Sequence, residues 1–447
     1  MALINTGMVR FAATALGGSS IEWYDFFLYA TAAVFVFPAL FFPADVPDYV
    51  ALMASLSTFA VGFVARPIGA VLFGHLGDRA GRRAAFVIVL SLMGFATTAI
   101  GLLPTYAEVG VAAPLALVFC RFAQGLAIGG HWGGVVLLLT ENSPSDKRGF
   151  YGAFAQAGAP LGIILANLAF LIASMSLSSE AFLEWGWRCP FVVNFALIGL
   201  ALYAKFNLEE TPVFQNVVNS DMQQEQLYWK GSPVFQAWRK FKREIGLAAG
   251  AFAGVQVACY TFLVFVVAYA TDPEGLAISR EDMLMVLMVS TAAQIPGLFL
   301  FSAYSDRHGR FGVYQLGCLL LGASVFAIFP VLESGSLWVI TIGFCLGQVI
   351  ISMMYGPYAA LLTELFSAEV RYSAASLSYQ LGATFGGGLA PLVAAAILAN
   401  TGSTFAVSVY MALACLVSWV CLGALGRSHI QEINCSELGD YNSSGMR

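Results

Sequence analysis

Charged residues are scarce in this chain. Only 11% of its 447 residues are Asp, Glu, Lys or Arg, whereas 59% are hydrophobic. Soluble domains are about one quarter charged, so this composition excludes an ordinary soluble protein and indicates a membrane protein. The eight cysteines are scattered, mostly through apolar stretches, without a CxxC pair. We therefore expect neither a disulfide framework nor a metal site.

Motifs of several other protein classes are also missing. The chain has no GxxxxGKS or GxxxxGKT loop for ATP and no HExxH pair for zinc. It also has no basic tract of the kind that binds nucleic acid. We therefore expect no enzyme, no metal, no bound cofactor and no nucleic-acid partner.

Long apolar runs dominate what the sequence does contain. A membrane-spanning helix needs roughly 20 apolar residues, and twelve stretches meet this need. They lie at residues 17–41, 50–76, 84–103, 112–140, 148–176, 188–207, 245–271, 282–304, 311–331, 337–365, 372–399 and 404–426. The predicted fold class is therefore an all-α integral membrane protein with twelve transmembrane helices.

One long polar stretch separates the sixth apolar run from the seventh. Most Lys and Arg residues fall on the same side of the spans as this stretch, and only Arg188 and Arg280 fall on the other side. The positive-inside rule then places both termini in the cytoplasm. We expect the polar tail to be disordered. The predicted parts are a six-helix bundle over 1–207, a cytoplasmic linker over 208–243, a second six-helix bundle over 244–426 and a cytoplasmic tail over 427–447.

A short motif occurs twice, half a chain length apart. The first copy is Gly74-His75-Leu76-Gly77-Asp78-Arg79-Ala80-Gly81-Arg82-Arg83 and the second is Ser305-Asp306-Arg307-His308-Gly309-Arg310. Both copies place Asp-Arg-x-Gly-Arg between two apolar runs. Further along, each half also has a Glu followed seven positions later by an Arg, as Glu141 and Arg148 and as Glu364 and Arg371. Two matches in the same order indicate two homologous halves.

Six further motifs stand at the ends of the apolar runs or inside them. They are Glu22-Trp23-Tyr24-Asp25-Phe26, Arg66-Pro67-Ile68-Gly69, Arg121-Phe122-Ala123-Gln124-Gly125, Gly129-Gly130-His131-Trp132-Gly133-Gly134, Trp187-Arg188 and Glu210-Thr211-Pro212-Val213-Phe214. With the twelve runs and the repeated motif, the chain resembles the major facilitator superfamily over about residues 15–426. The six motifs look like its metabolite:proton symporter family, which includes permeases for shikimate, 2-oxoglutarate, citrate and proline/betaine.

This resemblance implies a function. We expect a monomeric importer in the cytoplasmic membrane that moves a small polar metabolite, an organic acid or a zwitterion, together with protons. It would work by alternating access and would be driven by the proton gradient without a cofactor. Two alternatives stay open: efflux of a small drug-like compound by proton antiport, and a non-transporting sensor built on the same fold. The tail has no heptads, so the resemblance does not extend to a coiled-coil osmosensor.

The repeated motif is the candidate cytoplasmic gate. Asp78 can pair with Arg82, with Glu141 and with the positive N-terminal end of the eleventh span, and the second half can form the mirror arrangement. A simpler alternative is that the arginines only fix the topology. The full predicted gate is Gly74, Asp78, Arg79, Gly81, Arg82, Glu141, Arg148, Asp306, Arg310, Glu364 and Arg371.

Ionisable residues inside the predicted spans are the candidates for proton coupling. Each costs roughly 2.5–3.5 kcal/mol on insertion scales, so such residues usually face a cavity and have a function. Asp25 is the first candidate for the proton site, and Glu22 lies three positions away. Arg121, in the fourth span, matches the arginine that in the superfamily couples this span to the proton site, as the resemblance implies. The alternative is that the carboxylate and this arginine form a structural ion pair. His131 stands where the family commonly has Glu and is either a proton relay or a neutral hydrogen-bonding residue.

Arg66 is the candidate clamp for a substrate carboxylate, because a guanidinium group pairs bidentately with it. The alternative is a packing charge that pairs with Asp25 or Glu22. The other predicted substrate ligands are Tyr29, Gln124, Gln156, Tyr260, Gln348, Tyr355 and Gln380. A wider set of polar residues inside the spans adds Tyr24, Asn167, Asn194, Gln256, Gln294 and Tyr379.

Overall fold

The computed structural model describes residues 6–80, 82–130, 132–196, 199, 233–273, 275–366 and 371–444. Across these ranges the regular structure is helical, and no strand occurs in them. An apolar chain in lipid must fold this way, because every backbone N–H and C=O group needs a partner within its own segment. The all-α prediction is confirmed.

The first half of the chain runs from α1 to α10. Its elements are α1 (Thr6–Phe35), α2 (Phe37–Leu40), α3 (Asp48–Ala80), α4 (Arg82–Leu102), α5 (Tyr106–Val109), α6 (Ala112–Gly129), α7 (Trp132–Asn142), the 3₁₀ turn η1 (Ser145–Lys147), α8 (Arg148–Ser176), α9 (Ser179–Glu184), the 3₁₀ turn η2 (Gly186–Arg188) and α10 (Cys189–Val193).

The second half runs from α13 to α21. Its elements are α13 (Pro233–Tyr260), the π-helix η3 (Thr261–Phe265), α14 (Val266–Ala270), α15 (Arg280–His308), α16 (Arg310–Ser324), the 3₁₀ turn η4 (Val325–Ala327), α17 (Ile328–Glu333), α18 (Leu337–Leu365), α19 (Arg371–Gly382), the π-helix η5 (Ala383–Gly388), α20 (Ala390–Thr401) and α21 (Thr404–Ser444).

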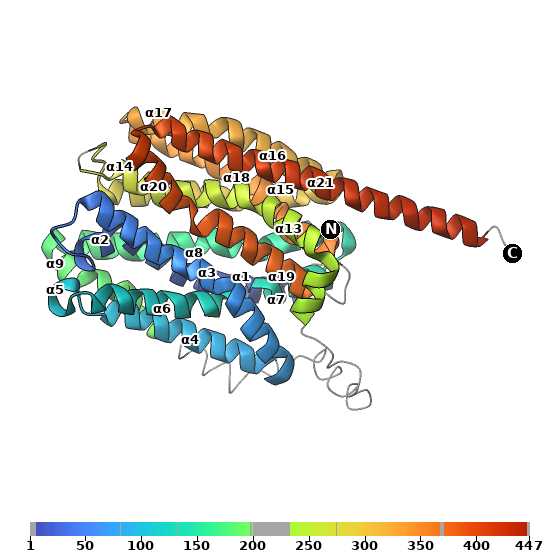
Figure 1. The fold of residues 1–447 in the computed structure, drawn as a ribbon, viewed down its shortest axis with the longest axis horizontal. Helices are drawn as coiled ribbons and strands as arrows, with labels where there is room; N and C mark the ends of the chain where they lie inside the picture. Colours follow the sequence, from blue (N-terminus) through green and yellow to red (C-terminus); the bar gives the residue numbers. More distant parts are fainter. Residues whose placement is uncertain are drawn as a thin grey trace.

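The two halves form two bundles that lie side by side (Figure 1). Helices of the first half, blue to green, lie below those of the second half, yellow to red. The bundles meet along two seams: α8 packs along α15 and α18, and α3 packs against α19, η5 and α20. Helix α1 begins and α21 ends at the same end of the molecule.

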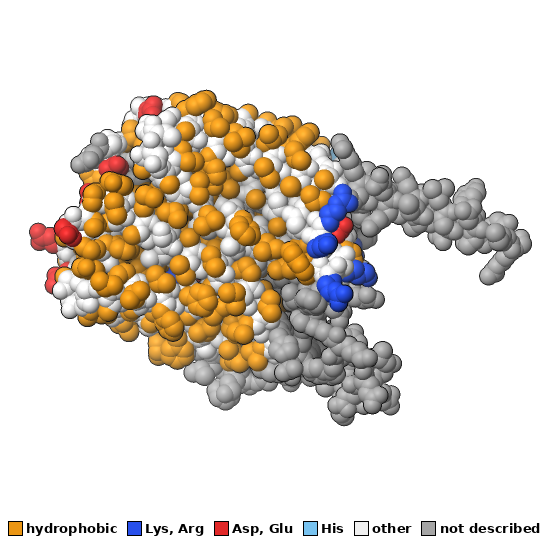
Figure 2. All heavy atoms as spheres, in the orientation of Figure 1, with side chains coloured by type: hydrophobic (Ala, Val, Ile, Leu, Met, Phe, Trp, Pro, Cys, Tyr) orange, Lys and Arg blue, Asp and Glu red, His pale blue; other side chains and the backbone are white. Residues whose placement is uncertain are grey.

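The outer surface is that of a membrane protein. Figure 2 shows apolar side chains covering the middle of the described face, with Asp and Glu near one end and Lys and Arg near the other. Large apolar residues such as Phe119 and Trp338 are 74% and 81% exposed, and exposed apolar surface of this extent marks contact with lipid. Among the described residues, nine helices are long and apolar enough to cross a membrane.

One predicted span is not a continuous helix. The sequence predicts a single helix over 112–140, but α6 ends at Gly129 and α7 begins at Trp132. The run of small residues 129–130 lets α6 approach α3 closely, because a Cβ atom at Gly129 would lie only 2.0 Å from the Arg66 carbonyl oxygen. The regular helix of α6 therefore ends where it lies against α3.

One expectation about a polar segment is wrong. The tail was expected to be disordered beyond residue 426, but α21 continues to Ser444. This segment contains no proline, so nothing interrupts its helical hydrogen bonding. Within the expected linker over 208–243, the described part is helical, because α13 begins at Pro233; the linker itself stays a prediction. Sequence polarity excluded both segments from the membrane without showing whether they are helical.

Candidate functional site

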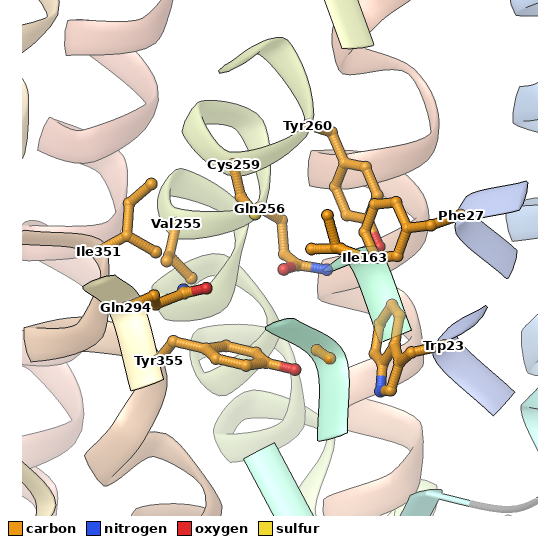
Figure 3. A pocket seen from close by; sticks show the side chains of 11 residues that line it. Trp23, Phe27, Ile163, Val255, Gln256, Cys259, Tyr260, Gln294, Ile351 and Tyr355 are labelled. Atoms are coloured by element: carbon orange, nitrogen blue, oxygen red, sulfur yellow. The ribbon is translucent and has the colours of Figure 1, made fainter. Parts of the chain in front are cut away.

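A small cavity of about 20 Å³ lies between the two halves. It has room for about one water molecule. Its lining comes from five helices, and Figure 3 shows these side chains. These residues are Trp23 and Phe27 of α1, Ala159 and Ile163 of α8, Val255, Gln256, Cys259 and Tyr260 of α13, Gln294 of α15, and Ile351 and Tyr355 of α18. Both halves therefore close around the cavity.

The hydrogen-bonding groups of this cavity come mainly from the second half. Figure 3 shows the Gln256 amide and the Tyr355 hydroxyl extending toward the side of the first half. Gln256 is 3% exposed, and its Nε2 atom has no hydrogen-bond partner. No Asp, Glu, Lys, Arg or His is among the described residues that line the cavity. The cavity thus offers uncharged hydrogen-bonding groups and aromatic faces to a ligand.

A charged cluster is buried in the first half, beside the aromatic wall of the cavity that Trp23, Phe27 and Tyr260 form. Asp25 and Arg121 are both 0% exposed, and Gln124 links them. The Arg121 Nη1 donates to Gln124 Oε1 at 3.0 Å, and Gln124 Nε2 donates to Asp25 Oδ2 at 3.1 Å. Gln124 also donates to Thr97 at 2.6 Å. Gln124, predicted as a substrate ligand, instead joins the two main candidates for proton coupling.

Phe26 lies between the two buried arginines. The guanidinium carbons of Arg66 and Arg121 lie 4.2 Å and 4.4 Å from the centroid of its ring. Arg66 also lies 4.2 Å from the ring of Phe63. The Nε and Nη2 atoms of both arginines have no hydrogen-bond partner, and Asp25 Oδ1 has none either. These cations are held by aromatic faces and keep N–H donors for a further acceptor.

Tyr260 connects this cluster to the cavity. It belongs to the second half and lines the cavity, and its ring centroid lies 5.0–6.0 Å from those of four rings of the first half, Phe26, Phe27, Phe59 and Phe63. The glycine-rich η5 permits this contact. A Cβ atom at Gly387 would lie 2.7 Å from the Tyr260 ring, and one at Gly388 would lie 2.5 Å from the Cβ atom of Phe63.

The other candidates of the first half are Glu22 and His131, predicted for proton coupling, and Tyr29, predicted as a substrate ligand. Glu22 is 5% exposed on α1, one turn before Asp25. Tyr29 lies beneath Arg121, 4.2 Å from ring centroid to guanidinium carbon, and its hydroxyl donates to Thr58 at 2.6 Å. Tyr29 thus supports the charged cluster and does not line the cavity. His131 lies outside the described residues.

A layer of contacts between the halves lies toward the α7 side of the cavity. The Trp132 ring stacks on Tyr379 at 3.7 Å between centroids. Gln156 accepts from the Trp132 indole at 3.2 Å and donates to the Tyr355 carbonyl at 2.9 Å. Gln380 donates to the Gly129 carbonyl at 3.3 Å. These contacts close one side of the cavity with paired side chains.

Several predicted substrate ligands lie in this layer or elsewhere outside the cavity lining, and their role in binding stays a prediction. Tyr260 and Tyr355 line the cavity, but Gln156, Gln348 and Gln380 do not. Gln156 and Gln380 are bound to backbone groups of the opposite half. Gln348 is fully buried, and neither polar atom of its side chain has a partner. Arg66 is 1% exposed, lies against the rings of Phe26 and Phe63 and is not part of the cavity lining.

The second copy of the repeated motif joins the two halves. Asp306 accepts from the backbone N–H groups of Gly149 and Phe150 at 2.8 Å and 2.9 Å, at the N-terminus of α8. Arg310 lies 2.9 Å from Asp306 and bonds both carboxylate oxygens of Glu364 at 2.7 Å. An anion at a helix N-terminus is favourable, so Asp306 fastens α15 to α8 across the seam.

The other gate candidates divide into two groups. Arg371 donates to the Phe366 carbonyl at 3.1 Å, and Arg148 begins α8, with its Nε atom lacking a hydrogen-bond partner. The candidates of the first copy fall outside what the structure describes. These are Gly81 itself and the side chains at Gly74, Asp78, Arg79, Arg82 and Glu141. Their roles stay predictions.

A further contact between the halves lies at the opposite end of α8 and α15. Ser174 donates to the Glu281 carboxylate. The Arg280 guanidinium carbon lies 5.5 Å from the ring centroid of Phe35 and 4.7 Å from that of Phe182. The sequence analysis used Arg280 only to set the topology. The same helix pair is therefore fastened at both of its ends.

Comparison with known proteins identifies the family and the fold. The model of the Major Facilitator Superfamily matches residues 26–391. Solved structures of the proton:xylose symporter XylE superpose with TM-scores of 0.70, bound to 6-bromo-6-deoxy-D-glucose, and 0.69, in a partially occluded inward-open conformation. The first covers 92% of this chain and 94% of its own at 16% identity, and the second covers 92% and 97% at 17%. These likenesses show the fold, which has twelve transmembrane helices in two bundles.

Curated relatives agree. The chain is 41% identical over 405 residues to an inner membrane metabolite transport protein, YhjE, of Escherichia coli (strain K12), covering 89% of each. It is 34% identical over 422 residues to the shikimate transporter of the same strain, covering 92% of each. It is 30% identical to the proline/betaine transporter of Salmonella typhimurium (strain LT2), covering 94% of this chain and 83% of that protein.

This chain belongs to the Major Facilitator Superfamily. It is a multi-pass membrane transporter of a small molecule and not an enzyme.

Proposed function

We propose that this protein carries a small polar metabolite with a carboxylate group across the cytoplasmic membrane, coupled to protons in symport. The observation that supports it most is one buried cluster beside a cavity of neutral polar groups, which holds an incompletely bonded carboxylate, Asp25, and two arginines, Arg66 and Arg121. The proton gradient drives the cycle, a single chain acts in the bilayer, and no cofactor takes part.

Asp25 is the proposed proton site. A buried carboxylate is costly unless it is paired or neutral. Here the Oδ2 atom of Asp25 accepts from Gln124, and its Oδ1 atom has no hydrogen-bond partner. Protonation removes the buried charge, whereas deprotonation requires compensation from Arg121 through Gln124. The two protonation states therefore favour different arrangements of α1 and α6, as coupling requires.

Arg66 is the proposed anchor for the substrate carboxylate. Its guanidinium group interacts with the Tyr260 hydroxyl and lies 5.7 Å from the ring centroid of Trp23. Both of these residues line the cavity. A movement of this aromatic wall would expose the unpaired N–H groups of Arg66 to a ligand. Shikimate and proline, named for two relatives, each carry a carboxylate group.

Alternating access then follows from the seams between the halves. Asp306 binds one end of α15 to the N-terminus of α8, and the stacked rings of Trp132 and Tyr379 close the side of the cavity toward α7. We assign this end to the cytoplasm, with both termini on the same side. Release of these contacts opens the cavity inward, and release of Glu281 from Ser174 opens it outward.

Efflux by proton antiport is a second candidate, favoured by the aromatic part of the lining, Trp23 and Phe27. The direction of proton movement distinguishes the two. The test uses purified protein in lightly buffered proteoliposomes, with external pH recorded as shikimate, 2-oxoglutarate, citrate, proline or betaine is added. Symport predicts external alkalinisation with one of these compounds. External acidification, or labelled-substrate exchange without proton movement, would contradict the proposal.

A further inference from the structure

A group of exposed cations occupies the beginning of α13, where the second half starts. Trp238 is 43% exposed, and the four cations that follow it are also exposed. These cations are Arg239, Lys240, Lys242 and Arg243. We call Trp238 and these four residues the basic face. In the sequence, the corresponding start of the first half carries only Arg10. The basic face is therefore particular to the second half.

The opposite side of this segment is anchored to the protein. Ala237 and Ile245 are 0% exposed. The Phe241 ring lies 5.9 Å from that of Phe366, which directly follows α18. Ala237 and Ile245 are thus buried and Phe241 is half-buried, whereas the four cations between and beside them are exposed. Because the segment is fixed from beneath, its cations stay directed outward.

The position of the basic face relates it to the membrane surface. Arg243 precedes the buried Ile245 by two residues, about 3 Å along the helix axis, and the apolar run of the seventh span begins there. The four cations fall within five consecutive residues, 239–243. At Phe241 the backbone leaves helical geometry, with φ −127° and ψ 29°, so the segment bends where the span ends. An exposed indole at such a boundary is typical of membrane interfaces.

We propose that the basic face binds the headgroups of anionic phospholipids. A soluble acidic partner would have to approach through screening that acts over about 8 Å at physiological ionic strength. Lipid phosphates, in contrast, are always present at this depth. Lys240 lies 5.4 Å from the centroid of the Phe241 ring, so its ammonium group stays close to the helix and beside its neighbours. Each cation near an anionic surface contributes a factor of about five to lipid binding.

The test compares lipids retained by the full-length protein. Wild-type protein and variants are placed in nanodiscs made from equal amounts of phosphatidylglycerol and phosphatidylcholine. Native mass spectrometry of the released complexes then gives the ratio of bound anionic to zwitterionic lipid. The wild type is expected to retain phosphatidylglycerol preferentially. The pair Lys240→Gln and Lys242→Gln is expected to lower this ratio by about tenfold or more, whereas Lys240→Arg and Lys242→Arg is expected to keep it.

The matched control removes the same charge elsewhere at this end of the molecule. Lys147→Gln with Arg307→Gln replaces two other exposed cations outside the basic face and should change the ratio less than the Lys240 and Lys242 pair does. Thermal unfolding of each variant verifies the fold. The proposal is overturned if the Lys240 and Lys242 pair retains lipid like the wild type. An equal loss in the control pair, or displacement of the lipid by soluble glycerol phosphate, also overturns it.

Discussion

The two halves share one fold but bury different chemistry. In the described membrane interior, the buried charges Glu22, Asp25, Arg66 and Arg121 all belong to the first half. The second half buries amides and hydroxyls, including Gln256 and Gln294 at the cavity, and its buried charge Arg310 lies in an end turn. An internal repeat therefore fixes the architecture, while the function of each half depends on its interior side chains.

The contrast suggests a division of functions between the two halves. Charges that change with protonation would act in the first half, and neutral groups that distinguish one polar ligand from another would act in the second. Tyr260 is the point of contact, because it lines the cavity and packs on Phe26 with a centroid distance of 6.0 Å. The predictions below break or sharpen this division, beginning with the largest expected effect.

Removing the proton site should have the largest effect. Asp25→Asn keeps the size of the side chain but cannot release a proton. Uptake against a gradient in proteoliposomes is expected to fall to background, while exchange of labelled substrate across the membrane continues. Exchange needs only alternating access with substrate bound, so it does not require a change of protonation. Gradient-driven accumulation by the Asn variant would remove Asp25 from the proton pathway.

Arg66→Lys tests the anion anchor. Lysine keeps the charge but loses the planar fork that pairs with a carboxylate. Charge-assisted hydrogen bonds contribute about 1.5–3 kcal/mol, so KM is expected to rise by roughly 10- to 100-fold. Initial uptake rates measure KM, and the number of protons per substrate should not change. An unchanged KM would place Arg66 in packing alone.

Asp306→Asn tests the seam between α8 and α15. Asparagine cannot accept from two backbone N–H groups and Arg310 as a carboxylate does, and its amide N–H₂ group opposes those donors. We expect the inward-open population to rise by about tenfold, from the loss of about 1.5 kcal/mol. Spin labels at Asp146→Cys and His308→Cys, in a background lacking the exposed Cys189, report the distance between the halves.

The control variant for this measurement is Arg307→Gln. It changes an adjacent exposed charge and should leave the distance distribution between the spin labels as in the wild type. If Asp306→Asn gives the same distribution as Arg307→Gln, the contact at the N-terminus of α8 does not hold the halves together.

Phe26→Leu tests the shared ring. Leucine fills part of the space without an aromatic face, so both guanidinium groups lose a contact of the kind that contributes about 1–2 kcal/mol when desolvated. The proton-to-substrate ratio is expected to fall by about half, while Phe26→Tyr keeps it. Phe170→Leu serves as the control, because Phe170 is also fully buried, and its ring contacts are with Phe182 and Phe191. Equal ratios in Phe26→Leu and Phe170→Leu would refute the role of the ring.

Gln256→Ala should have the smallest effect. It removes one neutral hydrogen-bonding group from the cavity, which contributes about 0.5–1.5 kcal/mol. KM is expected to rise by roughly 2- to 10-fold with an unchanged number of protons per substrate. A rise in KM for only one substrate of the panel would show that Gln256 contributes to substrate specificity. A changed proton ratio would argue against the division between the halves.

Much of the fold was predictable because hydropathy reports it directly. Apolar runs long enough to cross a bilayer identify spans, and a repeated Asp-Arg-x-Gly-Arg turn identifies the two halves. The end of α6 at Gly129 was not predictable, because glycine in an apolar run does not reveal where a neighbouring helix crosses. The helical extension of α21 was not predictable either, since polarity does not exclude helix.

The site was predictable by residue type and less so by position. Intramembrane Asp25, Arg66 and Arg121 stand out because charges there are costly, but only the structure shows that Gln124 joins two of them. A buried glutamine looks alike in sequence whether it lines a cavity, as Gln256 does, or binds a backbone carbonyl across the seam, as Gln156 does. Helix rotation decides between these cases, and a single sequence does not encode it visibly.

The most direct test counts protons per transported substrate in the same proteoliposomes for the wild type, Asp25→Asn and Gln256→Ala. The division between the halves predicts a fixed ratio in the wild type, no proton movement but continued exchange in Asp25→Asn, and the wild-type ratio at a raised KM in Gln256→Ala. A ratio that survives Asp25→Asn and changes in Gln256→Ala would contradict it.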